Sequence, residues 1–140
     1  ELRLKNFTPP TSGNIDMTSM TADEAQLTIR AALAAGFTEI KLTGELSKTG
    51  IGGNWGTFIN NKKITKCDLT GVTDWGRTPT LPDAAFSNCT ALQEVTLPDD
   101  MKVIGGGAFF GCAALTKVNL SQVTWINLNA FHWRRSLWIM

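Results

Sequence analysis

The sequence predicts an α/β solenoid, a right-handed stack of coils in which short parallel strands lie above one another behind an N-terminal capping helix. The first observation is a repeat: AAFSNCTALQEVTLP at residues 84–98 returns 23 residues later as GAFFGCAALTKVNLS at 107–121. The second is a helical pattern that comes before the repeats. Because self-similarity with a period of about 20 to 50 residues is typical of stacked architectures, the repeats govern the organisation of the chain.

Residues 1–20 are expected to form an extended lead-in, because they hold two prolines and many small polar residues. Within this lead-in, LRLKNF at residues 2–7 could form a short strand.

A helix is predicted over residues 22–35. Thr21-Ala-Asp-Glu24 is a capping box, in which the threonine and the glutamate each accept a backbone N–H of the first turn. Gly36 stands where a left-handed residue ends a helix. The apolar stripe of this helix is Ala25, Ile29, Ala32 and Leu33.

Six apolar positions recur in the two clearest coils: Phe86, Cys89, Leu92, Val95, Leu97 and Ile104 correspond to Phe109, Cys112, Leu115, Val118, Leu120 and Ile126. Weaker copies keep the same offsets at Phe58, Ile64, Cys67 and Leu69, and at Phe131, Leu137 and Met140. The predicted strand centres are therefore Ile40, Cys67, Val95, Val118 and Met140, which implies five coils.

Each coil is expected to begin with a strand, L-x-x-V-x-L, and to continue through a turn into a tight helical or 3₁₀ return, I-x-x-x-A-F-x-x-C. A connection between parallel strands of one sheet takes a right-handed path. One such coil cannot bury its apolar side alone, so neighbouring coils must stack to complete a core.

At AFSNCTALQEVTLPDDMKVIGGGAFFGCAALTKVNL, residues 85–120, the pattern resembles the BspA-like leucine-rich repeats, which belong to surface and secreted proteins of anaerobic bacteria and some parasitic protozoa. The match is tight over 81–120, weaker over 55–75 and 121–140, and absent over 1–35. Two departures make the outer coils less regular. Asn61 and Arg134 occupy the family's cysteine position, and Cys67 occupies a valine position in the strand core.

The resemblance implies a right-handed leucine-rich-repeat solenoid with an extracellular or cell-surface binding role, such as adhesion, and no catalysis. We expect a single domain over 1–140, with the lead-in and capping helix in 1–36 and four to five repeats in 37–140. The chain begins at Glu1, which is compatible with removal of an export signal.

Composition argues against several other classes of protein. A net charge of +1 offers no field for nucleic acid, and no stretch is apolar for long enough to insert into a membrane. Three cysteines without a C-x-x-C pair do not predict a zinc site, and no cofactor is expected. The single histidine, His132, has no nucleophile near it in the repeat pattern. The glycine-rich segments GGNWG and IGGGAF lack the lysine of a phosphate loop, so Gly105–Gly107 are expected to serve a tight turn.

Cys89 and Cys112 occupy equivalent places in adjacent coils, about one strand spacing apart. That separation is close to what a disulfide tolerates, but cysteines in such positions more often serve as small buried fillers. The sequence favours two buried thiols and leaves a bridge as the alternative.

The residues that flank each strand centre should point away from the core, on the concave face of the stack. The position before the centre is Glu39, Lys66, Glu94 and Lys117, and the position after it is Lys41, Asp68, Thr96 and Asn119. The first set alternates in charge, which could set the order of the coils by mutual attraction. The alternative is a polar recognition surface for protein or glycan.

Three tryptophans are weighed as surface or wall residues. Trp75 and Trp125 align with Val103, next to the core Ile104, and are expected to belong to the wall. Trp55 lies in an insertion outside the repeat pattern and is the candidate for exposure and ligand contact.

The end of the chain would leave an open sheet edge after the fifth strand. Trp133, Arg134 and Trp138 are therefore expected to form a cap or an end-to-end dimer contact, unless the natural chain continues. The sequence as a whole predicts a non-enzymatic binding or adhesion module at the cell surface, whose partner is an extracellular protein, a cell or a glycan. The alternative is a structural spacer that presents other domains.

Overall fold

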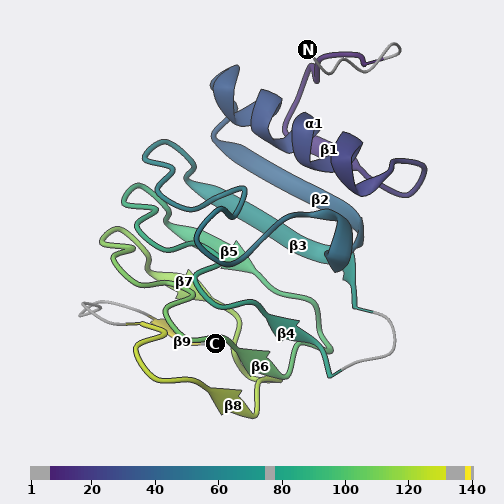
Figure 1. Ribbon diagram of the computed structural model, residues 1–140. Coiled ribbons are helices and arrows are strands. Elements are labelled where there is room, and N and C mark those ends of the chain that lie inside the picture. The colour runs from purple at the N-terminus through teal and green to yellow at the C-terminus, as the bar shows by residue number, and fades with distance from the viewer. Residues whose placement is uncertain (1–6, 75–77, 132–137, 140) are drawn as a thin grey trace.

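The structure is a computed structural model that describes residues 7–74, 78–131 and 138–139 (Figure 1). The strand expected in LRLKNF, and the roles expected of Trp75, His132, Trp133 and Arg134, therefore lie outside the described residues, apart from Phe7. The side chain of Trp138 is also outside them.

The described strands form two parallel sheets that run side by side along the stack (Figure 1). Sheet A has the order β1-β2-β3-β5-β7-β9, and sheet B has the order β4-β6-β8. The strands of sheet A are β1 (Asn14–Asp16), β2 (Glu39–Glu45), β3 (Lys66–Thr73), β5 (Glu94–Thr96), β7 (Lys117–Val118) and β9 (Trp138–Ile139). Those of sheet B are β4 (Thr80–Leu81), β6 (Val103–Ile104) and β8 (Trp125–Ile126). The predicted stack of short parallel strands is confirmed.

The helix α1 (Ala22–Ala34) lies over the β2 end of the stack, with a short 3₁₀ helix, η1 (Leu46–Lys48), beside it (Figure 1). The capping box is present, because Thr21 accepts the Glu24 N–H and Glu24 accepts the Thr21 N–H. At the other end Gly36 has a φ of 95°, and the Phe37 N–H reaches back to the Ala32 carbonyl oxygen at 3.1 Å. This is a Schellman motif, the end that the glycine predicted.

The register of sheet A aligns the predicted strand centres. Ile40 pairs with Cys67, Cys67 with Val95, and Val95 with Val118. The next partner of Val118 is Ile139. The predicted centre at Met140 was therefore wrong by one residue, because the last strand joins the ladder earlier than the repeat offset suggests.

The strand β1 was missed in the sequence, where residues 1–20 read as an extended lead-in. It pairs in parallel with β2, Ile15 opposite Leu42, and thus extends sheet A by one strand. Its three residues alternate exposed, buried and exposed, but a three-residue alternation is too short to identify a strand by itself.

The predicted helical return was wrong in part. Ile104 lies in β6 of sheet B, a sheet that the sequence did not predict. After β6 the chain turns by successive short-range bonds, such as that from the Cys112 N–H to the Phe109 carbonyl oxygen at 3.2 Å, without forming a helix. The glycine turn is confirmed, because a Cβ on Gly105 would lie 2.5 Å from the backbone nitrogen of Asp83.

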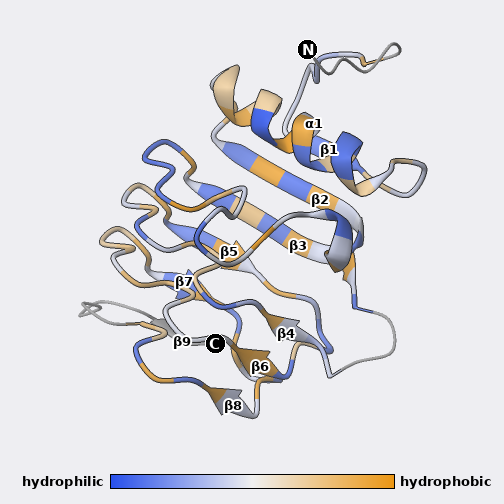
Figure 2. Ribbon diagram, in the orientation of Figure 1, coloured by the Kyte–Doolittle hydropathy of each residue, from blue (hydrophilic) through white to orange (hydrophobic). Residues whose placement is uncertain are grey.

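The core runs as one cluster from the helix through the stack. Along β2 and β3 apolar and polar residues alternate, so each strand presents an apolar row to the core and a polar row to solvent (Figure 2). At the centre Phe58, Phe86, Phe109 and Phe131 stack ring on ring, with centroid distances of 5.0–5.6 Å. Equivalent residues of successive coils therefore touch, as the repeat predicted.

Candidate functional site

The candidate site is the solvent face of sheet A. Residues next to each buried strand centre must point outward, because successive side chains of a strand alternate between faces. Glu39 and Lys41 flank the buried Ile40 on β2, and both are exposed. On β3 the exposed Lys66 and the half-buried Asp68 flank Cys67 in the same way.

The parallel register gathers these residues into two columns. Glu39, Lys66, Glu94 and Lys117 are successive partners in the first column. In the second, Lys41 is opposite Asp68, which is opposite Thr96. The columns enclose a hollow of about 310 Å³, and six of the eight predicted site residues line it: Glu39, Lys41, Lys66, Asp68, Glu94 and Thr96.

Charge alternates down the first column, but few of these side chains form ion pairs with their neighbours. Lys117 Nζ lies 3.7 Å from a carboxylate oxygen of Glu94, the one ion pair found among the described residues. Glu39 and Lys66 are neighbours in register but form no ion pair within those residues. One of the three rungs of the predicted charge ladder is thus closed by an ion pair within the described residues.

Two of the predicted residues are partly committed to the protein's own backbone. Asp68 Oδ1 accepts hydrogen bonds from the Thr70 N–H at 2.9 Å and the Thr70 hydroxyl at 2.7 Å. Asn119 accepts from the Leu97 N–H at 2.6 Å and donates to the Leu97 carbonyl oxygen at 2.9 Å. Asn119 thus continues the β5–β7 ladder with its side chain and lies outside the hollow.

Asn14 on β1 also lines the hollow, and the sequence analysis missed it. It is the register partner of Lys41 and so extends the second column by one strand. The signal was the polar–apolar–polar order of Asn14, Ile15 and Asp16, which gains meaning only once β2 lies beside it.

Trp55 is exposed, as predicted, with 89% of its surface accessible. It sits in the loop between η1 and β3, where Arg30 Nη2 of α1 donates to its carbonyl oxygen at 2.9 Å. That bond fixes the backbone of the loop while the indole stays in solvent. Ligand contact by Trp55 remains a prediction.

The cysteines are buried thiols in the structure, as the sequence favoured. The Cys89 thiol donates to the Phe58 carbonyl oxygen at 2.9 Å, and the Cys112 thiol donates to the Phe86 carbonyl oxygen at 3.0 Å. Burial raises the pKa of the Cys89 thiol to about 12, and burial likewise raises the pKa of Cys67. Such thiols are poor nucleophiles and serve the packing of the coils.

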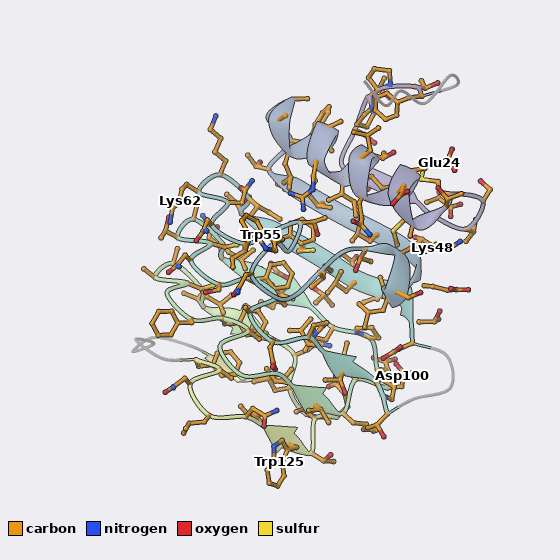
Figure 3. The ribbon with its side chains drawn as sticks, viewed as in Figure 1. Glu24, Lys48, Trp55, Lys62, Asp100 and Trp125 are labelled. Atoms are coloured by element: carbon orange, nitrogen blue, oxygen red, sulfur yellow. The ribbon has the colours of Figure 1, made fainter. Side chains whose placement is uncertain are left out.

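The far end of the stack carries exposed apolar side chains, those of Trp125 and Ile126 of β8 and of Leu128. Figure 3 shows Trp125 at this end. The alignment of Trp125 with Val103 is confirmed, but its expected place in the wall was wrong, because 63% of its surface is accessible. Ile126 is 47% exposed, whereas its counterpart Ile104 is fully buried. The difference arises because a following coil covers Ile104, and no described coil of sheet B follows β8.

Two further features concern ion and membrane binding. No group of three or more His, Cys, Asp or Glu side chains in the described part of the chain is placed to hold a metal ion. Within the same ranges, no helix combines the length and apolar character that crossing a bilayer requires.

Comparison with known families finds a match to the BspA type leucine rich repeat region, in six copies over residues 56–138. The matched segment includes β3 to β8 and the first residue of β9, and it leaves out β1, α1, β2 and η1. No curated protein and no solved structure matches the chain.

Proposed function

The chain belongs to the BspA-type leucine-rich repeat family, and from this premise we propose that it is a cell-surface or secreted adhesion module whose partner is a host protein, another cell or a glycan. Repeat domains of this family are generally non-enzymatic scaffolds for protein interaction, and they typically occur in surface or secreted proteins of bacteria. The binding surface is the solvent face of sheet A.

The observation that carries the proposal is the state of the charges on this face. Glu39, Lys41 and Lys66 are exposed around one hollow and form no ion pair within the described residues. Charged groups that do not pair with each other remain available to a partner of complementary charge. Their strands are rigidly stacked, so binding would require little ordering of the face.

The test is a screen on an array of matrix proteins and glycans. Wild-type protein is compared with the double variant Lys41→Glu/Lys66→Glu, which reverses two charges of the hollow. The matched control is Lys48→Glu/Lys102→Glu, which reverses the same number of charges at two lysines that do not line the hollow. Binding that is lost in the double variant and kept in the control, with unchanged thermal unfolding, supports the proposal. A wild-type chain that binds nothing on the array would favour the alternative, a structural spacer.

We further propose that the chain self-associates at the C-terminal end of the stack, as the sequence led us to expect. The partner there is a second copy of this chain. Residues 118–131 contain no Asp, Glu, Lys or Arg, whereas Arg134, which the sequence analysis assigned to the same contact, lies outside the described residues. The coil exposes Trp125, Ile126 and Leu128, and β8 lacks the charged residues that usually protect a sheet edge. Light scattering across a concentration series tests this contact. A monomer at every concentration, or a dimer that Trp125→Lys leaves intact, would exclude it.

A further inference from the structure

A second hollow, of about 490 Å³, lies between the C-terminal half of α1 and the turn that follows Phe58. Three basic residues line it, Arg30 from the helix and Lys62 and Lys63 from the turn, and no acidic residue does. We call this the basic hollow. Segments far apart in sequence build it, so it was not visible in the sequence analysis.

Two of the three cations of the basic hollow, Arg30 and Lys62, are held in place by hydrogen bonds without being neutralised. Arg30 Nη2 donates to the Trp55 carbonyl oxygen at 2.9 Å, and Lys62 Nζ donates to the Asn88 carbonyl oxygen at 3.1 Å. Both acceptors are uncharged backbone groups. No carboxylate of the described residues forms an ion pair with Arg30, Lys62 or Lys63. The site therefore keeps a local positive charge on a protein whose net charge is only +1.

Two asparagines add neutral donors to the basic hollow. Asn60 Oδ1 accepts from Asn88 Nδ2 at 3.2 Å. Asn61 Oδ1 accepts from the N–H groups of Lys63 and Ile64 at 3.0 and 2.8 Å. In both amides the oxygen is used by the protein, so the NH₂ group is the part left for a ligand. A ligand that fits must be anionic and rich in hydrogen-bond acceptors.

Trp55 is bonded through its backbone to one of these donors, and its indole ring is exposed, although Trp55 is not among the residues that line the hollow. Arg30 lines the hollow and holds the Trp55 carbonyl oxygen, and Thr57, two residues further along, also lines the hollow. Figure 3 shows Trp55 and Lys62 in the loops next to α1. A flat amphipathic ring can pack against the apolar face of a sugar ring while the neighbouring cations and amides bind its carboxylate, sulfate and hydroxyl oxygens.

We propose that the basic hollow is a second binding site, specific for an acidic polysaccharide and separate from the solvent face of sheet A. The combination of fixed cations, amide donors and an exposed indole matches repeating rings that carry both hydroxyl and acidic groups. A nucleic acid is less well matched, because its binding draws on a broad basic surface and this chain has one local cluster. The proposal does not depend on the function proposed for sheet A.

The test uses heparin and hyaluronan oligosaccharides as probes, with a neutral dextran oligosaccharide as the control ligand, in isothermal titration calorimetry. We expect binding to at least one acidic probe and none to dextran, with affinity that falls as salt rises from about 50 to about 300 mM. Lys62→Gln/Lys63→Gln should weaken this binding by about tenfold or more, because two charge-assisted contacts are lost. Lys48→Gln/Lys102→Gln, which removes the same charge from two lysines that line neither hollow, should leave it unchanged.

A second variant separates sugar binding from general anion binding. Trp55→Ala keeps the backbone carbonyl that Arg30 binds and removes only the indole, so it should also weaken polysaccharide binding. Thermal unfolding of each variant confirms that the fold is kept. The proposal is overturned if neither acidic probe binds, if Lys48→Gln/Lys102→Gln weakens binding as much as the hollow variant, or if Trp55→Ala has no effect. Tighter binding of poly-glutamate or duplex DNA than of the polysaccharide would also overturn it.

Discussion

The rings of Phe86 and Phe109 stack with their centroids 5.6 Å apart and their planes 6° from parallel, although the two residues are 23 positions apart in the chain. Phe58 and Phe131 continue the stack on either side. This column joins consecutive coils through the centre of the protein. It holds in register the strands that carry the candidate site.

The inner rings of this column should contribute more to the stability of the protein than the ring at its end. Phe86→Ala is expected to destabilise the protein by roughly 3–5 kcal/mol, because Phe86 is fully buried between two other rings. Phe131→Ala is the matched control. It should destabilise the protein clearly less, since Phe131 is only partly buried. Chemical denaturation of the two variants measures the difference. Equal losses would show that the stack does not depend on contacts between coils.

Ala84 occupies a strained backbone position, with a φ of 59°. The equivalent residues of the next coils are Gly107 and Asn129, with φ of 66° and 61°, and these residue types adopt this conformation more readily. Ala84→Gly is therefore expected to stabilise the protein by about 0.5–1 kcal/mol, as the relief of strain exceeds the entropy cost.

The control for this change is the neighbouring Ala85, which is fully buried and not among the residues with positive φ. Ala85→Gly should destabilise by roughly 1 kcal/mol, since it loses a buried methyl group and gains chain entropy when unfolded. Thermal melts of both variants test these opposite changes in stability. The strain argument fails if Ala84→Gly melts at or below the wild-type temperature.

The buried cysteines should resist modification in the folded protein. Since burial raises the pKa of Cys89 to about 12, its thiolate is scarce near pH 8, and iodoacetamide should react slowly. After unfolding without a reductant, all three cysteines should be alkylated, which mass spectrometry counts. Two cysteines that stay unmodified in the unfolded chain would instead indicate a Cys89–Cys112 bridge.

The thiols of Cys67 and Cys89 should make stability fall at alkaline pH. Their folded pKa values lie above the unfolded value of about 8.5, so the unfolded chain loses its protons first. The stabilising effect is complete below about pH 8.5 and is lost as the pH rises toward 12. Denaturation midpoints for Cys89→Ala against wild type should show a weaker alkaline decline in the variant; parallel curves would contradict the assignment.

The helix start should respond to acid. Hydrogen bonds from the backbone and side chain of Thr21 hold the pKa of Glu24 below its usual range. A lowered folded pKa means that the stabilisation is present above the unfolded pKa and is lost as the pH falls through the folded value. Glu24→Gln keeps an acceptor for the capping box but cannot titrate, so its stability should depend less on pH in the acid range. Thr21→Ala should cost about 1 kcal/mol at neutral pH, and urea denaturation across pH measures both.

Much of the candidate site was accessible from the sequence because the strand centres repeat. Once Ile40, Cys67 and Val95 are placed at equivalent positions, the alternation of side chains fixes which neighbours share the outer face. Asn119 was placed on that face for the same reason. Periodicity reports which way a residue points but not which hydrogen bonds its amide makes, and the bonds to Leu97 follow only from the distance between the two coils.

The sequence by itself determined the stack, its register through Val118 and the helix that covers it, because these depend on spacing along the chain and on local capping. Tertiary structure alone decided that β1 and the two-residue strands of sheet B exist, since strands so short are held only by the neighbours to which they bond. It also decided that Trp125 is exposed and that Arg30 and Lys62 line the same hollow. Both depend on which segments pack against which, and no local pattern encodes that.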